Sequence, residues 1–140
     1  MTNPIVLRLR GYIGKEVKDS PSPVSHFLRG ILVEVEEGMV EAEYIVHQEF
    51  TNPLGTLHGG IMAAIIDDTV GAAVYTLALP TPFVTITLNI DYMAPANLGE
   101  TIFVRSEVFK KGKTVINAIS WVKNKAGVYL AKASSNLIAK

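Results

Sequence analysis

The sequence predicts an α+β fold in which an antiparallel sheet of about six strands wraps around one long helix. Segments that alternate between apolar and polar residues follow one another with short turns between them, which favours antiparallel neighbours. One stretch, residues 61–77, is instead apolar on all sides, as expected of a helix enclosed by other structure. The length of 140 residues is typical of one domain, so we expect residues 1–140 to form a single domain.

Residues 1–30 are expected to form an N-terminal extension with two short helices. The first covers residues 5–13. The second begins at Pro23, whose fixed φ suits a first helical turn, with Ser22 as its cap. It is expected to reach Leu28 and to end at Gly30.

Two strands then form a hairpin around the turn Glu37-Gly38. The first strand is expected to place Ile31, Val33 and Val35 on one face. The apolar positions of the second strand are Val40, Ala42, Tyr44 and Val46. A loop at residues 49–57 leads to the long helix.

Four more strands follow Pro80 and Pro82, which end the helix. They are predicted at residues 83–92, 101–109, 114–122 and 128–138. The alternation in the first of them places Val84, Ile86, Leu88, Ile90 and Tyr92 on one face. It places Thr85, Thr87, Asn89 and Asp91 on the other face.

The composition excludes several classes of function. Thirteen basic and thirteen acidic residues cancel, so no basic excess predicts a nucleic-acid partner. The absence of cysteine removes disulfides, thiolate nucleophiles, iron–sulfur clusters and cysteine-bound zinc. His26, His47 and His58 lack the spacing of metal ligands, so no metal or other cofactor is expected.

No membrane partner is expected either. The most apolar stretch, residues 59–79, contains Asp67 and Asp68, and each would cost about 2.5–3.5 kcal/mol in a membrane-spanning helix. Pro4, Arg8 and Arg10 interrupt the apolar residues at the start, which therefore lack the layout of a signal peptide. These observations predict a cytoplasmic protein.

The start of the long helix is the first candidate for chemistry. His58 is followed by Gly59 and Gly60, and glycines at a helix N-terminus let a ligand approach the backbone closely. The free N–H groups there can hold an anion or a developing oxyanion. The same residues would also suit a tight turn without any ligand, with His58 as a helix cap.

Asp67 and Asp68 are the second candidate, because a carboxylate within an apolar helix is costly to bury. Composition alone does not choose between the two. His58 and Asp67 are nine positions apart, which is a net half turn and about 13.5 Å along a helix. If both serve one site, they come from two chains, and a symmetric dimer has two such sites.

The segment from Asn52 to Asp67 resembles the hotdog-fold acyl-CoA thioesterases, in the PaaI-like branch of the phenylacetate pathway. The shared pattern is an Asn, a Gly, His-Gly-Gly and an acidic residue nine positions after the His. The resemblance continues through residues 89–95, 98–100 and 110–114. It implies the hotdog fold and hydrolysis of an acyl-CoA to the free acid and CoA.

The resemblance also implies roles for individual residues. The N–H of Gly59 would polarise the thioester carbonyl, with help from the side chain of Asn52, and His58 would maintain the geometry of the site. Asp67 of the partner subunit would be the general base or the nucleophile, and Thr85 would orient water or this carboxylate. The spacing selects Asp67 over Asp68, and leaves attack by water or by the carboxylate itself undecided.

Binding of the CoA part is expected to involve Gly60 and the lysines around Gly112, with Arg105 as a weaker candidate. Lys110, Lys111 and Lys113 could contact phosphates, or could be solvated lysines of a turn. A homodimer or a dimer of dimers is expected. Two other functions remain as alternatives: a hotdog-fold hydratase or dehydratase, and an acyl-CoA binding module without catalysis. The acyl group stays open.

Overall fold

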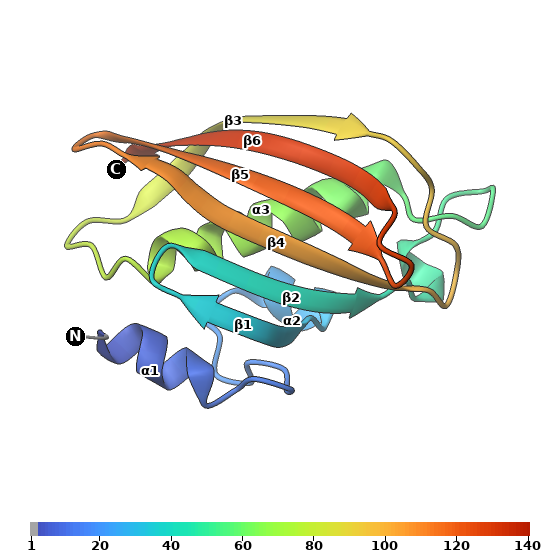
Figure 1. Cartoon of the computed structure of the whole chain (residues 1–140), viewed down its shortest axis with the longest axis horizontal. Coiled ribbons are helices and arrows are strands. Elements are labelled where there is room, and N and C mark those ends of the chain that lie inside the picture. Colours follow the sequence, from blue (N-terminus) through green and yellow to red (C-terminus); the bar gives the residue numbers. More distant parts are fainter. Residues whose placement is uncertain (1–2) are drawn as a thin grey trace.

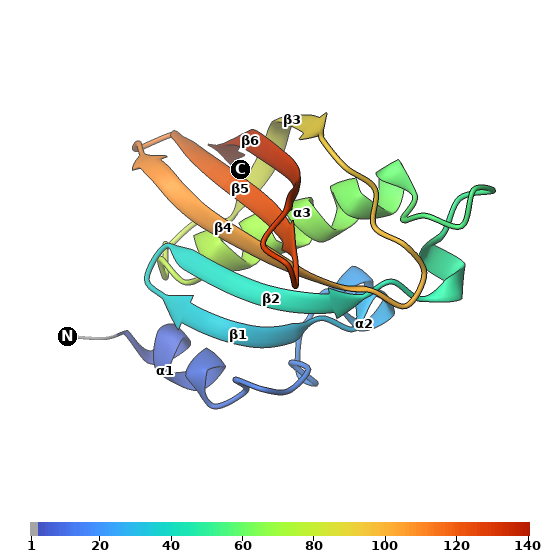
Figure 2. The ribbon, with the colours of Figure 1, turned by 45° about the vertical axis from the view of Figure 1, so that its right-hand side comes forward.

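The computed structural model describes residues 3–140, and it confirms the predicted α+β fold with a six-stranded antiparallel sheet curved around one helix (Figures 1 and 2). The order of the strands across the sheet is β1-β2-β4-β5-β6-β3. Their bounds are β1 Ile31–Glu36, β2 Met39–Ile45, β3 Phe83–Tyr92, β4 Thr101–Lys111, β5 Val115–Asn124 and β6 Tyr129–Ala139. β4 extends two residues beyond its predicted end, so the turn to β5 lies at residues 112–114.

The central helix, α3, covers Gly59–Tyr75 and packs against β2 and β4 on the concave side of the sheet. Ile65, Ile66 and Ala73 are completely buried there. A chain of buried hydroxyls also joins helix and sheet: Oγ1 of Thr69 lies 2.8 Å from Oγ of Ser106, which lies 2.7 Å from Oγ of Ser120. α3 is therefore fixed against the sheet by apolar packing and by hydrogen bonds, and no buried side-chain nitrogen or oxygen within residues 3–140 lacks a partner.

The two predicted N-terminal helices are present as α1 (Pro4–Arg10) and α2 (Pro23–Leu28). α1 ends three residues earlier than predicted. α2 has the predicted Ser22 cap, but it is ended by Arg29, which adopts a left-handed conformation with φ of 56°. Gly30 has another role: a Cβ there would lie 2.5 Å from the ring of Tyr44, so a side chain is excluded.

β-bulges in β1 and β3 change which side chains face the core, so the predicted faces of these two strands are partly wrong. In β1, the register shifts between Leu32 and Glu34, so Leu32 faces the core with Val35, and the predicted placement of Val33 is wrong. In β3, the register shifts between Thr85 and Thr87. Thr85 pairs with the buried Leu137, and Leu88 pairs with the buried Ser135. The bulge therefore places Thr85 on the same, inner face as Leu88, and the predicted separation of the two faces is wrong here.

β3 is an edge strand along its whole length (Figure 1). It pairs with β6 on one side, and its other side has no partner within residues 3–140. Its outward apolar side chains are exposed: Val84 by 44% and Ile86 by 52%. A long, unprotected apolar edge of this kind is a template for pairing with another chain. In the described part of the chain, no helix is long and apolar enough to cross a membrane.

Candidate active site

The first group of predicted residues lies at the start of α3. His58 caps the helix: its Nδ1 accepts a hydrogen bond from the N–H of Gly60 at 2.8 Å, and its own N–H donates to the carbonyl of Phe50. The hydroxyl of Tyr92 donates to the carbonyl of Gly59 at 2.7 Å. The N–H of Gly59 has no acceptor among residues 3–140, so it remains available to a ligand.

Gly59 is not required by the packing of the protein itself. A Cβ at this position would lie 3.5 Å from Tyr92, which is ordinary van der Waals contact. At Gly60, a Cβ would lie 3.1 Å from the ring of His58 and would press on the capping histidine. The two glycines therefore differ: Gly60 keeps the cap in place, and Gly59 presents an open backbone amide.

Asn52 stabilises the loop that precedes α3. Its Oδ1 accepts hydrogen bonds from the N–H groups of Leu54 and Thr56 at 3.0 and 3.1 Å. Its Nδ2 donates to the hydroxyl of Thr56 at 2.8 Å. One hydrogen of the side-chain amide is left for a ligand. Asn52 thus orders the loop, and its side-chain amide can donate one hydrogen bond to a ligand, in addition to the one that the amide of Gly59 can donate.

The second group lies in the middle of α3. Asp67 is exposed, and its Oδ1 accepts a hydrogen bond from Oγ1 of Thr85 at 2.9 Å. The bulge in β3 is what turns Thr85 toward the helix. The structure therefore brings together two of the predicted residues that are 18 positions apart in the chain. A carboxylate with one oxygen fixed and the other free is suited to accept a proton from water.

Asp68 is the neighbour of Asp67 in sequence but has a different environment. Oγ of Ser25 lies 2.8 and 3.0 Å from its two carboxylate oxygens, and Oγ of Ser22 lies 3.4 Å from one of them. Burial raises the pKa of Asp68, the serine hydrogen bonds oppose this, and the charge of Asp67 adds to it. Burial, and then the charge of Asp68, also raises the pKa of Tyr44 far above its ordinary value. The hydroxyls of Ser22 and Ser25 therefore hydrogen-bond the carboxylate of Asp68, whereas the carboxylate of Asp67 is exposed to solvent.

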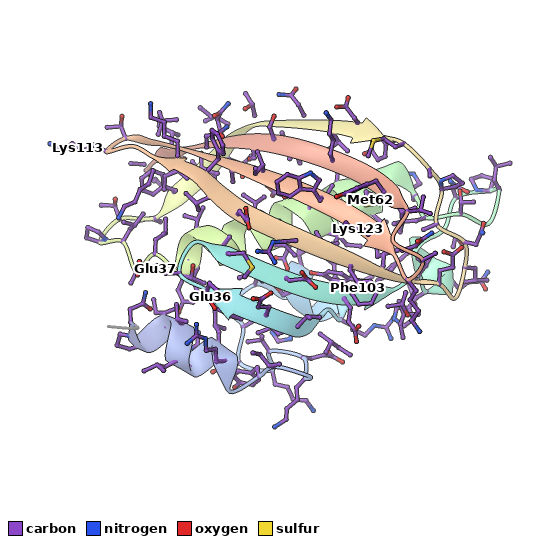
Figure 3. The ribbon with its side chains drawn as sticks, in the orientation of Figure 1. Glu36, Glu37, Met62, Phe103, Lys113 and Lys123 are labelled. Atoms are coloured by element: carbon purple, nitrogen blue, oxygen red, sulfur yellow. The ribbon has the colours of Figure 1, made fainter. Side chains whose placement is uncertain are left out.

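The two groups do not meet within one chain. α3 is continuous from Gly59 to Tyr75, so His58 and Asp67 are separated by about 13.5 Å along its axis. The predicted lysines lie at yet another place: Lys113 is at the tip of the β4–β5 hairpin, at the opposite end of the molecule from the loop that contains Asn52 (Figures 1 and 3). Lys110 and Lys111 are exposed near the same tip. Arg105 is held by Glu34, Glu41 and Glu107 and is not free for a phosphate.

A cavity of about 580 Å³ opens beside Asp67 and Thr85. This volume is within the range of about 300–1,000 Å³ of small-molecule sites. Tyr75, Phe83 and residues of the N-terminal segment line it. Its remaining wall is mainly apolar, with Leu32, Val40, Ala42 and Leu137 from the sheet. An apolar group attached to a carbonyl near Asp67 would fit this space.

No group of three metal-binding side chains occurs within the described residues. The chain does carry the separate parts that acyl transfer requires: an open backbone amide at a helix start, a hydrogen-bonded carboxylate and a mainly apolar cavity. A family model described as the thioesterase superfamily matches residues 54–125, about half of the chain. The chain belongs to the thioesterase superfamily. This membership confirms the prediction of a hotdog-fold thioester hydrolase.

The relatives agree with this assignment. Human acyl-coenzyme A thioesterase 13 is 40% identical over 95 residues, which are 68% of this chain and 68% of the relative. The structure of zebrafish thioesterase superfamily member 2 is 29% identical, with coverage of 99% of this chain and 97% of the relative and a TM-score of 0.79. The PaaI protein of E. coli shares the fold, with a TM-score of 0.80, 18% identity and 86% of each chain covered.

Sequence reasoning missed three residues of this site. Tyr92 fixes the carbonyl of Gly59, and Ser22 and Ser25 bind Asp68. Ser22 was predicted only as a helix cap. No sequence signal points from these positions to their partners, which lie 33 to 46 residues away. Only the packing of α2 and β3 against α3 brings them together.

Proposed function

We propose that this thioesterase hydrolyses acyl-CoA esters, with Asp67 as the general base that activates the attacking water. The observation that carries this proposal is the carboxylate of Asp67, which is exposed, hydrogen-bonded to Thr85 and part of the lining of a mainly apolar cavity. The acyl group would enter the cavity, and the thioester carbonyl would lie near Asp67. Water adds to the carbonyl, its proton moves to Asp67, and collapse of the tetrahedral intermediate releases CoA thiolate.

The negative charge on the carbonyl oxygen needs a donor, and the N–H of Gly59 supplies it. A backbone amide at a helix N-terminus has the positive end of the helix dipole behind it, and it needs no reorganisation during the reaction. His58 and Tyr92 fix this amide by their hydrogen bonds to Gly60 and to the carbonyl of Gly59. The free hydrogen of Asn52 would be a second donor.

Gly59 and Asp67 can act on one carbonyl only if they come from two subunits. The exposed edge of β3 supports a homodimer, because pairing of this edge with its copy would cover Val84 and Ile86. In such a dimer, each site takes Gly59, His58 and Asn52 from one chain and Asp67 and Thr85 from the other. Two dimers can associate further, since the outer face of the sheet, with Phe103 and Lys123, remains uncovered (Figure 3).

The phosphates of CoA would lie outside the cavity. Lys110, Lys111 and Lys113 are exposed at the β4–β5 tip, and positive charge there suits the phosphate groups. In one chain this tip and the loop before α3 lie at opposite ends of the molecule (Figures 1 and 3), so the lysines would serve the site that contains Asp67 of the same subunit. A cytoplasmic location would match a substrate that is made and used inside cells.

The experiment is a thiol-release assay on a panel of aryl-acetyl, aroyl and aliphatic acyl-CoA esters. Release of CoA thiol that is lost in the Asp67→Asn variant supports the proposal. A shift in the absorbance of an enoyl-CoA without thiol release would indicate a hydratase or dehydratase instead. Saturable binding without any turnover would indicate a binding module. Size-exclusion chromatography with light scattering distinguishes monomer, dimer and tetramer.

A further inference from the structure

One face of α3 is built around the cavity. Seven residues of α3 line the cavity, and all but Thr69 recur at spacings that place them on a single face. The seven are Ala64, Asp67, Asp68, Thr69, Gly71, Ala72 and Tyr75. Three of the seven are Ala or Gly, so the helix leaves space where larger side chains would fill it. The cavity therefore depends on small residues next to the catalytic carboxylate.

The opposite wall comes from the segment between α1 and α2 together with α2 itself. This end wall, residues 16–26, contributes Glu16, Val17, Ser20, Pro21, Ser22, Val24, Ser25 and His26 to the lining of the cavity. Internal contacts shape it: Arg8 binds Asp19 at 2.9 Å, and Nε2 of His26 lies 2.7 Å from the carbonyl of Ser20.

The end wall is attached to α3 through Asp68. The single hydroxyl hydrogen of Ser25 is shared between the two carboxylate oxygens at 2.8 and 3.0 Å, and the hydroxyl of Ser22 donates from 3.4 Å. Asp68 lies one residue after Asp67, so the helix turn that presents the catalytic carboxylate to the substrate also fixes the wall of the cavity. A carboxylate is well suited here, because each of its oxygens can accept a bond from Ser25.

Gly71 borders free space where a side chain would fit. A Cβ built on Gly71 meets no other atom within 4 Å, although the residue lines the cavity. It lies one turn after Asp67 along the same face of the helix, and like Asp67 it is exposed. A large side chain at this position would occupy the cavity without displacing other residues of the chain.

We propose that the end wall, attached to α3 by Asp68, closes the acyl pocket, and that Asp68 and Gly71 set the length of the acyl group that is accepted. Gly71 is a specificity-determining residue because its missing side chain leaves room for the acyl chain. Asp68 is a positioning residue, which acts through Ser22 and Ser25 and does not touch the reacting atoms. This inference rests on the proposed function, since it assigns the acyl group to this cavity.

The test measures binding of S-alkyl-CoA thioethers from ethyl to dodecyl by titration calorimetry, because thioethers bind but are not hydrolysed. Gly71→Leu should weaken binding of the dodecyl analogue about tenfold, the effect of about two displaced methylene groups. It should change binding of the ethyl analogue by less than about twofold. Gly71→Ala is the matched control, and it should change the profile much less.

The role of Asp68 is tested with a second set of variants. Ser25→Ala and Asp68→Leu remove the attachment, so the preference between ethyl and dodecyl analogues should shift by about threefold or more. Asp68→Asn keeps one acceptor for Ser25 and should restore the wild-type profile. A general loss of stability would weaken binding of all lengths alike and would not change the preference.

An unchanged length profile in folded Gly71→Leu, Ser25→Ala and Asp68→Leu overturns the inference. The same holds if the wild-type protein binds ethyl and dodecyl analogues equally or binds neither. A wild-type protein that shows the expected length dependence but hydrolyses no acyl-CoA would overturn the proposed function alone. Circular dichroism of each variant establishes that it is folded.

Discussion

Thr85 donates a hydrogen bond to Asp67 at 2.9 Å, although the alternation of apolar residues in β3 assigns Thr85 to the opposite face of the strand. The β-bulge between Thr85 and Thr87 is the cause, since one extra residue reverses the facing of the side chains before it. Bulges often aim a side chain at a functional site. Here the bulge gives the exposed carboxylate of Asp67 a fixed orientation.

Thr85→Ala should therefore lower kcat about tenfold to a hundredfold, the usual effect of losing a hydrogen bond to a charged group. Thr85→Ser keeps the hydroxyl and should stay close to wild type. The measurement is kcat and KM on the best acyl-CoA of the panel. Equal activities of the Ala and Ser variants would show that the hydroxyl has no effect on kcat, which contradicts the orienting role.

Asp67→Asn should lower kcat by about 10²–10⁴, because the general base is removed. Asp68→Asn should retain most of the activity on a short acyl-CoA. The reason is that the Asp68 carboxylate is hydrogen-bonded by serine hydroxyls and is not the proposed base, and that the side-chain oxygen of Asn can still accept a hydrogen bond from Ser25. If Asp68→Asn were the inactive variant, the assignment of the base would be off by one residue.

Thermal unfolding of the wild type and of Asp68→Asn tests the environment of Asp68. Burial raises its pKa above the ordinary value of 3.8, so the folded state disfavours the ionised form, and stability falls as the pH rises above that value. The neighbouring charge of Asp67 acts in the same direction. At neutral pH, the Tm of Asp68→Asn should equal or exceed that of the wild type. A clear loss of Tm in Asp68→Asn would mean that the charge itself stabilises the fold.

Gly59→Pro removes the backbone hydrogen that we assign to the oxyanion. Proline is favoured at the first position of a helix, and His58 has φ of −63° and ψ of 134°, which suit a residue before proline. The helix should therefore form, and kcat should fall about 10²–10³-fold. Gly59→Ala keeps the N–H and makes only ordinary contact with Tyr92, so it should lose much less. Similar losses in the two variants would contradict a role of the amide.

Lys111→Ala combined with Lys113→Ala should raise KM about tenfold with little change in kcat, because the CoA phosphates are remote from the bond that breaks. The KM of the wild type should also rise with salt, through screening. Lys123→Ala in β5 with Lys125→Ala in the turn that follows it is the matched control and should leave KM unchanged. If the first pair behaves like the control, its lysines are solvated turn residues.

The sequence predicted those parts of the site that depend on local order. His58, Gly59 and Asp67 follow from one stretch of chain, because a helix fixes the spacing of its own residues. The prediction of which face of β3 carries Thr85 was wrong. The alternating residues around Thr85 contain no signal for the position of the β-bulge. The difference in environment between Asp67 and Asp68 comes from Ser25, 43 residues from Asp68 in the chain, and depends on the packing of α2 against α3.

Whether each site is shared between two chains can be tested by subunit complementation. Gly59→Pro and Asp67→Asn, each nearly inactive alone, are unfolded and refolded together. In a heterodimer, one shared site would take Gly59 from one intact copy and Asp67 from the other, and the second site would carry both changes. Random pairing makes about half of the dimers heterodimers, so about a quarter of the wild-type activity should return. If one chain supplied both groups, every site would keep one change and no activity would return, even with heterodimers demonstrated by mass spectrometry.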